Sequence, residues 1–241
     1  MLHPAHALGA GDVRAATGLS AQALVGSASD QIRRADALAS ASNGVVPSDP
    51  SFARGAMALA ALAPALAPYV GARVGLGQQF EGGVAYTGRG ARIDARRAFS
   101  SGPWALSIGA GLDGTFAGGS STIKLPGVDI GSLRGFGFDV PVLAGWRSQS
   151  SLYQVWAGAR GGWERYFIAP VTTEPNRAVP SLEADRVRVA GVIGVATGFG
   201  HVHVGLELEV GWQSVSGHLG ATSASVDGVA LTPASAVWWD F

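Results

Sequence analysis

The sequence predicts an all-β protein, a closed antiparallel up-and-down β-barrel of about ten strands that crosses a membrane. Three observations lead to this prediction. Only 14% of the 241 residues are charged, against about 25% in soluble domains. Long stretches alternate apolar and polar residues. Breaks rich in Gly, Pro or Ser separate these stretches. We expect the whole chain, residues 1–241, to form a single domain.

The clearest alternation runs from His201 to Gln213. Successive side chains of a strand point to opposite faces. One face here carries only apolar residues, namely Val202, Val204, Leu206, Leu208, Val210 and Trp212. A strand in a soluble sandwich usually has about 5 to 6 residues, and this stretch is twice as long. Long strands with apolar residues outward and polar residues inward are typical of transmembrane barrels.

The breaks divide the chain into about ten strands. In order, we expect them at residues 11–26, 66–76, 80–87, 91–99, 104–118, 132–148, 152–171, 182–199, 201–217 and 228–241. Short turns are expected at 77–79, 88–90, 100–103, 148–150 and 198–200, and longer connections at 27–65, 119–131, 172–181 and 218–227. Every second connection from Gly77 onward is then short, as in barrels with short periplasmic turns. Alternatively, residues 80–99 form one long strand, which would make the number of strands odd.

Within the connection over residues 27–65, the sequence predicts one short helix. The Ala-rich stretch Gln31–Ala41 follows possible N-cap residues at Ser29 and Asp30. We expect residues 47–50 to end this helix and lead the chain back to the barrel. Two roles stay open for residues 27–55: a plug that constricts the lumen, with Arg33 and Arg34 facing its carboxylates, or a solvated cap.

No transmembrane helix is expected. The longest apolar stretch, residues 56–70, is interrupted by Pro64 and Pro68 and is shorter than the roughly 20 residues needed to span a bilayer. Residues 57–67 could be the apolar part of a signal peptide, but patterned strand sequence precedes them. No secretory signal is visible at residues 1–4, so we expect that one was removed or lies upstream.

Aromatic residues gather near both ends of the apolar faces. One group is Phe80, Trp104, Trp146, Tyr153 and Trp239, and the other is Tyr86, Phe136, Trp163, Phe167 and Trp212. Such girdles are expected where amphipathic rings meet lipid headgroups. The alternative is that these rings form a soluble core, which their terminal placement disfavours.

The opposite faces carry charged residues of both signs. The predicted inward network is Arg14, Arg73, Glu81, Arg92, Asp94, Arg96, Asp113, Asp139, Arg147, Arg160, Glu164, Arg186, Arg188, His201, His203, Glu207 and Glu209. Charges in a narrow interior must pair to offset lost hydration, so we expect cross-strand ion pairs that fill much of the lumen. Arg97 and Arg165 fall on the outward face near strand ends, from where they can reach headgroups.

The chain ends in a strand whose last outward residues are Val237, Trp239 and Phe241. In this feature the sequence resembles the outer-membrane β-barrel proteins of Gram-negative bacteria, whose final strand ends in an aromatic residue. The resemblance implies a bacterial outer-membrane location with both termini periplasmic. It also implies contact with membrane lipid, and recognition of these three residues by the barrel-assembly machinery.

No catalytic, cofactor-binding or metal-binding residue is predicted. Successive inward residues of one strand are about 7 Å apart, so His201, His203, Glu207 and Glu209 do not converge on one ion. The glycines at 75, 77, 82 and 83 lack the strand, helix and acidic residue of a dinucleotide site. Neutral net charge gives no footprint for nucleic acid.

The predicted function is non-enzymatic, a structural or surface-interaction role with a largely filled polar lumen. The alternative is a narrow passive channel for small solutes. A third hypothesis, an outer-membrane protease or lipid hydrolase, would need His218 near the rim to meet acids from neighbouring strands. The candidates for that cluster are Glu183, Asp185 and Asp227, with Ser214 or Ser216 as nucleophile. Ligand and oligomeric state do not follow from the sequence.

Overall fold

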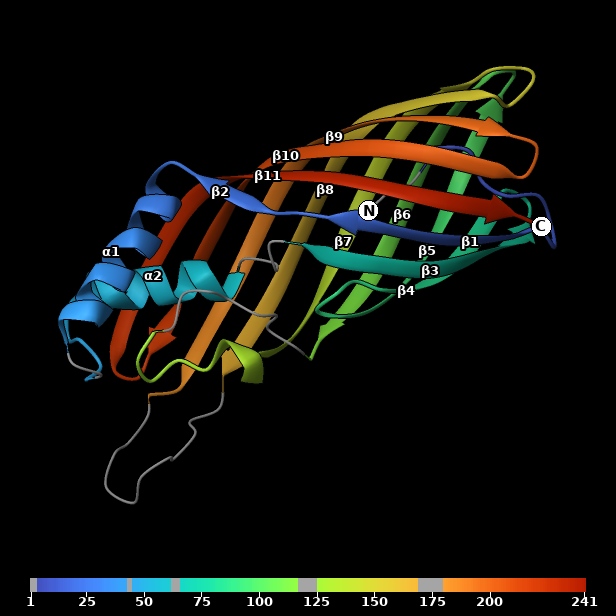
Figure 1. Cartoon of the computed structure of the whole chain (residues 1–241). Helices are drawn as coiled ribbons and strands as arrows, with labels where there is room; N and C mark the ends of the chain where they lie inside the picture. Colours follow the sequence, from blue (N-terminus) through green and yellow to red (C-terminus); the bar gives the residue numbers. More distant parts are fainter. Residues whose placement is uncertain (1–3, 43–44, 62–65, 117–124, 169–179) are drawn as a thin grey trace.

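The computed structural model describes residues 4–42, 45–61, 66–116, 125–168 and 180–241. Its strands form one antiparallel sheet in which β1 pairs with β3 and each strand from β3 to β11 pairs with the next along the chain. β11 pairs with β1 and β2, which closes the barrel (Figure 1). The strands are β1 Val13–Ser20, β2 Ala23–Val25, β3 Ala67–Gly77, β4 Phe80–Tyr86, β5 Gly90–Ser101, β6 Trp104–Thr115, β7 Arg134–Arg147, β8 Tyr153–Ile168, β9 Leu182–Phe199, β10 Val202–Leu219 and β11 Thr222–Asp240. The prediction of a closed up-and-down barrel is confirmed.

The first strand is interrupted but still counts as one wall strand. β1 and β2 both pair with β11, from Arg14 opposite Asp240 to Val25 opposite Val229. The interruption falls opposite Pro233, which has no amide hydrogen to donate. With β1 and β2 taken together, the wall has the ten strands that the sequence predicts.

The hairpin interpretation of residues 80–99 is confirmed. β4 and β5 pair antiparallel from Phe80 opposite Arg97 to Tyr86 opposite Ala91. The turn between them contains Gly88 with φ of 78°, a conformation that glycine adopts without steric cost. The alternative of one long strand is therefore excluded.

The predicted long connection at residues 218–227 is wrong. β10 and β11 stay paired up to Leu219 opposite Thr222, so a tight turn at Gly220 joins them. The Ser, Thr and Ala residues here have loop-like composition, but Leu219 and Val226 are buried on the inner face. The outward residues at this end of the hairpin, Ser216, His218 and Ser223, are polar and exposed, which suits water better than lipid. The predicted alternation of short and long connections therefore fails at this hairpin.

Two helices, not one, precede β3. Helix α1 spans Ser27–Ala41 and begins after Gly26, and it has no side-chain cap at its start. The predicted caps at Ser29 and Asp30 are wrong, because both residues lie inside the first turn. Helix α2 spans Pro50–Ala61, and the carboxylate of Asp49 accepts a hydrogen bond from the Ser51 amide (2.8 Å) at its start. An N-cap Asp before a Pro at the first helical position is a helix-start signal. The expectation that residues 47–50 form a loop back to the barrel is therefore wrong at Asp49 and Pro50.

The outer surface of the barrel is apolar. On β10 the outward residues Leu206, Val210 and Trp212 are 57%, 42% and 48% exposed. Soluble proteins rarely expose continuous apolar patches of this extent. Within the described residues, neither helix is long and apolar enough to span a bilayer. The exposed apolar side chains on the outer face of the strands fit a lipid environment.

Two buried apolar clusters lie inside the barrel at its opposite ends. We call the end with α1 and α2 the helical end, and the end with the C-terminus the terminal end (Figure 1). At the helical end, α2 packs against the inner faces of β9, β10 and β11. At the terminal end, Trp156, Val192 and Trp238 pack around Ala5 of the N-terminal segment. Charged residues occupy the interior between the two clusters.

Candidate functional site

The structure places most of the predicted inward residues inside the barrel. Those that are buried are Arg14, Arg73, Glu81, Arg92, Arg96, Asp139, Arg160, Glu164, Arg186, His203, Glu207 and Glu209. Asp94, Asp113, Arg147 and Arg188 are half-buried. Their cross-strand partners, which the sequence did not specify, determine what the interior can do.

His201 is the exception, and its inward placement was wrong. It is exposed in the turn before β10 begins at Val202, and its Nδ1 shares a hydrogen bond with the Asp240 carbonyl (2.8 Å). The alternation of faces holds only within a paired strand, and His201 lies just outside one. The other three residues considered as metal ligands have separate partners: His203 stacks on Trp238, Glu207 binds Trp156 and Glu209 binds Arg160.

Glu81 is the centre of the ion pairs nearest the terminal end. Its carboxylate accepts from Arg73 Nε (2.5 Å) and from the Leu8 amide (3.0 Å), and Arg96 Nε lies 2.7 Å away. Arg73 also donates to Asp94 (2.5 Å). Glu81 is fully buried, so each of these contacts offsets part of its lost hydration.

A second group of ion pairs lies toward the helical end. Arg92 binds Asp139, and Arg160 donates to Glu209 (2.8 Å). Arg186 lies 2.6 Å from Glu164. These pairs join β5 to β7, β8 to β10, and β9 to β8, so the charged side chains cross-link much of the wall.

Glycines allow several of these pairs to skip a strand. Gly83 stands between Arg73 and Asp94, Gly111 lies beside Arg92, and Gly194 stands between Trp156 and Glu207. A Cβ at Gly194 would lie 2.1 Å from the Trp156 ring. The missing side chain on the middle strand therefore gives room for a long side chain to lie across it and reach the strand beyond.

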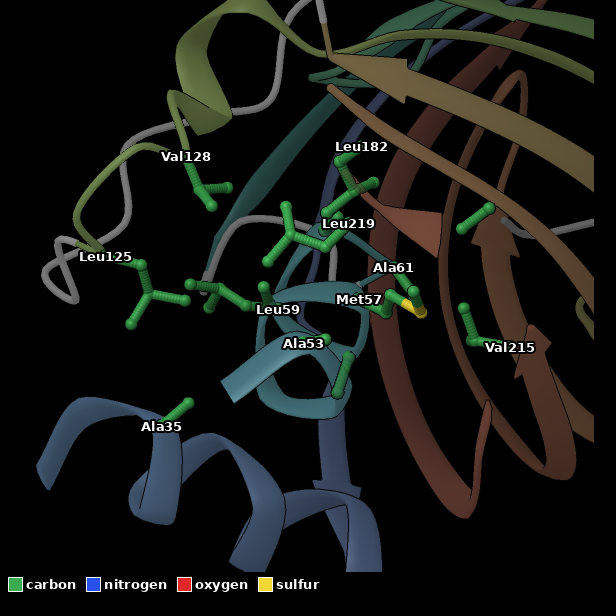
Figure 2. Close-up of a cluster of buried hydrophobic side chains, with 14 of the residues drawn as sticks. Ala35, Ala53, Met57, Leu59, Ala61, Leu125, Val128, Leu182, Val215 and Leu219 are labelled. Carbon is green, nitrogen blue, oxygen red and sulfur yellow. The ribbon is translucent and has the colours of Figure 1, made fainter. Parts of the chain in front are cut away.

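Helix α2 fills the opening of the barrel at the helical end. Met57 and Ala61 face Leu182, Val215 and Leu219 of the wall, as Figure 2 shows. Phe52 is fully buried in the same cluster. The plug considered for residues 27–55 is thus formed by α2, which overlaps only the end of that range. The basic residues of α1 do not face the lumen: Arg33 pairs with Asp30 on the helix surface, and Arg34 is exposed.

Two arginines hold the C-terminal end of α2. Arg89 donates to the Ala60 carbonyl (2.8 Å), and Arg186 donates to the Ala61 carbonyl (2.5 Å). The last carbonyls of a helix have no partner within the helix and carry partial negative charge. Arg89 was predicted only as a turn residue, so this contact was missed. The signal that could have indicated this contact is the basic residue in the predicted turn Gly88-Arg89-Gly90.

The N-terminal segment fills the terminal end. Arg96 donates to the His6 carbonyl (3.1 Å), Leu8 donates to Glu81, and His6 Nε2 bonds the Pro103 carbonyl (3.2 Å). Ala5 is 1% exposed. No place was predicted for residues 4–9, because no pattern in them indicates a strand or helix.

Protonation of His6 is expected to loosen this segment. Burial, with the nearby guanidinium of Arg147, lowers the pKa of His6 to about 4, below the roughly 6.5 of an exposed histidine. The folded state therefore prefers the neutral ring, and its stabilisation is complete above pH 6.5 and lost as the pH falls toward 4. Limited proteolysis should cut residues 4–9 faster at pH 4 than at pH 7. His6→Gln should remove this pH dependence, and equal cutting of the parent at both pH values would contradict the expectation.

The C-terminal residues lie as their alternation predicts. Val237, Trp239 and Phe241 are 44%, 49% and 71% exposed on the outer side, whereas Trp238 is buried. Phe241 exchanges backbone hydrogen bonds with Val13, so the last residue joins the seam between β11 and β1. Recognition of these residues by an assembly machinery stays a prediction.

The rim around His218 has an arrangement that the sequence only partly anticipated. His218 lies beside Glu183 of β9, and Ser223 of β11 forms a hydrogen bond with its Nδ1 (2.9 Å). On the same face, two and four residues along β10 from His218, Ser216 lies beside Asp185 and Ser214 lies beside Asp227. Glu183 pairs with Arg165 (3.3 Å). An open groove of about 600 Å³ is lined by Arg165, Glu183, Asp185, Ser216, His218 and Ser223 from this set, but not by Ser214 or Asp227.

An apolar outside and a charged, cross-linked inside on a closed antiparallel sheet define the class of transmembrane β-barrels. No family model and no curated protein matches the chain. Among solved structures, the barrel is similar to the crystal structure of Neisserial surface protein A, NspA. The identity is 11% and the TM-score 0.33, and the match covers 95% of this chain and 96% of that one.

Proposed function

We propose that this chain is an integral outer-membrane β-barrel with a packed interior, and that its role is structural or one of surface interaction. The observation that supports the proposal is the filling of the lumen in three layers. Residues 4–9 occupy the terminal end, ion pairs the middle, and α2 the helical end. A passive channel needs a continuous polar path, and in the described part of the chain both plugs lie across the lumen.

The proposed orientation puts both termini in the periplasm. The turns at the terminal end join their strands through few residues, as between Phe199 and Val202. The connections from β6 to β7 and from β8 to β9 lie at the helical end and are longer. Long loops lie outside the cell in outer-membrane barrels. On this proposal the groove near His218 and Ser223 faces the exterior, where a surface partner would meet it.

A narrow channel is the second candidate, because a small polar cavity of about 130 Å³ remains in the interior. Single-channel conductance in a planar bilayer separates the two. We expect no conductance from the refolded parent. A variant with residues 50–61 replaced by a Gly-Ser linker should also be silent, because two filled layers remain. Arg33→Ser serves as the control on α1. Steady conductance of the parent would support the channel and contradict the packed lumen.

A further inference from the structure

The interior cavity of about 130 Å³ has a cationic lining. Five guanidinium groups surround it, from Arg89, Arg92, Arg160, Arg186 and Arg188. The carboxylates in the lining are those of Asp113, Glu164 and Glu209. A cavity of this size holds a few water molecules or one small ion with water. The excess of positive groups favours an anion.

Arg188 lies farther from its carboxylate partners than Arg160 and Arg186 lie from theirs. Glu164 lies 2.6 Å from Arg186 but 3.7 Å from Arg188, and Glu209 lies 2.8 Å from Arg160 but 3.9 Å from Arg188. The Arg188 side chain lines the cavity and is 22% exposed, whereas those of Arg160 and Arg186 are 6% and 5% exposed. Its guanidinium hydrogens are therefore open to an acceptor inside the cavity, and a hydrogen bond from a charged donor is a strong one.

We propose that the cavity binds one tetrahedral oxyanion that carries a proton, of the hydrogen phosphate class. Guanidinium forks match the spacing of phosphate oxygens and bind them through two parallel hydrogen bonds. Asp113 lines the same cavity, and within the described residues its carboxylate accepts no hydrogen bond and forms no ion pair. Its carboxylate accepts the hydrogen of a P–OH group. Sulfate has no such hydrogen at neutral pH, so Asp113 repels it.

The site does not depend on whether the barrel conducts, because the cavity lies within the charge network. The test measures thermal unfolding and calorimetric binding of the refolded full chain in detergent micelles. The added salts are sodium phosphate, sodium sulfate and sodium chloride at equal ionic strength, so that general screening is the same. Glycerol phosphate is added separately as a bulkier headgroup fragment that carries the same phosphate group.

Phosphate is expected to bind and raise Tm, and sulfate to bind about tenfold or more weakly. Arg188→Gln should weaken phosphate binding at least about tenfold, since a charge-assisted hydrogen bond is lost. Asp113→Asn should remove the preference for phosphate over sulfate. Arg147→Gln is the matched control, because Arg147 is a half-buried inward arginine outside the lining, and it should bind phosphate as the parent does.

Arg188→Lys keeps the charge without the planar fork and tests the same contact if Arg188→Gln does not fold. It should bind phosphate more weakly than the parent. Equal effects of phosphate and chloride on the parent would overturn the proposal and indicate a water-filled cavity. Unchanged phosphate affinity in both Arg188 variants would also overturn it. Binding of glycerol phosphate as tightly as phosphate would place the anion on the surface instead.

Discussion

Glu81→Ala is expected to lower the free energy of unfolding by about 3–5 kcal/mol, the range for breaking a buried ion pair from one side. The loss is large because one carboxylate serves Arg73, Arg96 and the Leu8 amide. Its removal leaves two buried guanidiniums with fewer counter-charges. Urea unfolding of the refolded protein in lipid or detergent, followed by tryptophan fluorescence, measures the change.

Glu183→Ala is the matched control for this experiment. Glu183 also pairs with an arginine, Arg165 at 3.3 Å, but both side chains are about half exposed. A surface pair of this kind contributes less than about 1 kcal/mol. Similar losses in the two variants would mean that burial does not set the strength of these pairs. The N-terminal segment should also become more sensitive to protease in Glu81→Ala, because Leu8 loses its acceptor.

Phe52→Asp is expected to release α2 from the barrel while the wall stays folded. Phe52 is fully buried where α2 packs against the wall, and a buried carboxylate without a partner there costs well over about 3 kcal/mol. The hydrogen bonds that close the barrel run between strands and do not pass through α2. Circular dichroism should therefore retain the β signal of the parent.

The absence of cysteine from the chain makes the release of α2 measurable with one introduced thiol. Ala58→Cys places it at a position that is 1% exposed. The thiol should resist a water-soluble maleimide in the parent background and react at least about tenfold faster together with Phe52→Asp, because labelling follows the open population. Ser40→Cys on the exposed face of α1 should react in both backgrounds. Continued protection of the Ala58→Cys thiol in the Phe52→Asp background would contradict the plug assignment.

Strand positions and faces were predictable wherever a residue lies within a paired strand. The stretch from His203 to Trp212 shows this, since its large apolar residues are exposed and its charged residues are buried, as expected. The predictions failed at the ends of elements. His201 is in a turn, residues 218–227 continue a hairpin, and α2 begins at Pro50, where a loop is expected from the sequence. Composition is ambiguous there, because polar residues suit both a loop and a strand outside the lipid.

The wall of this protein, a barrel with an apolar outside and a charged inside, follows from local pattern. The two-residue period of a strand assigns each side chain to a face. Which charges pair, and which segments close the ends, depends on contacts that appear only in the folded chain. The contacts of Arg92 with Asp139, of Trp156 with Glu207, and of Arg186 with the end of α2 join distant residues. Such contacts depend on the register between strands and on the glycines between them, which no local pattern encodes.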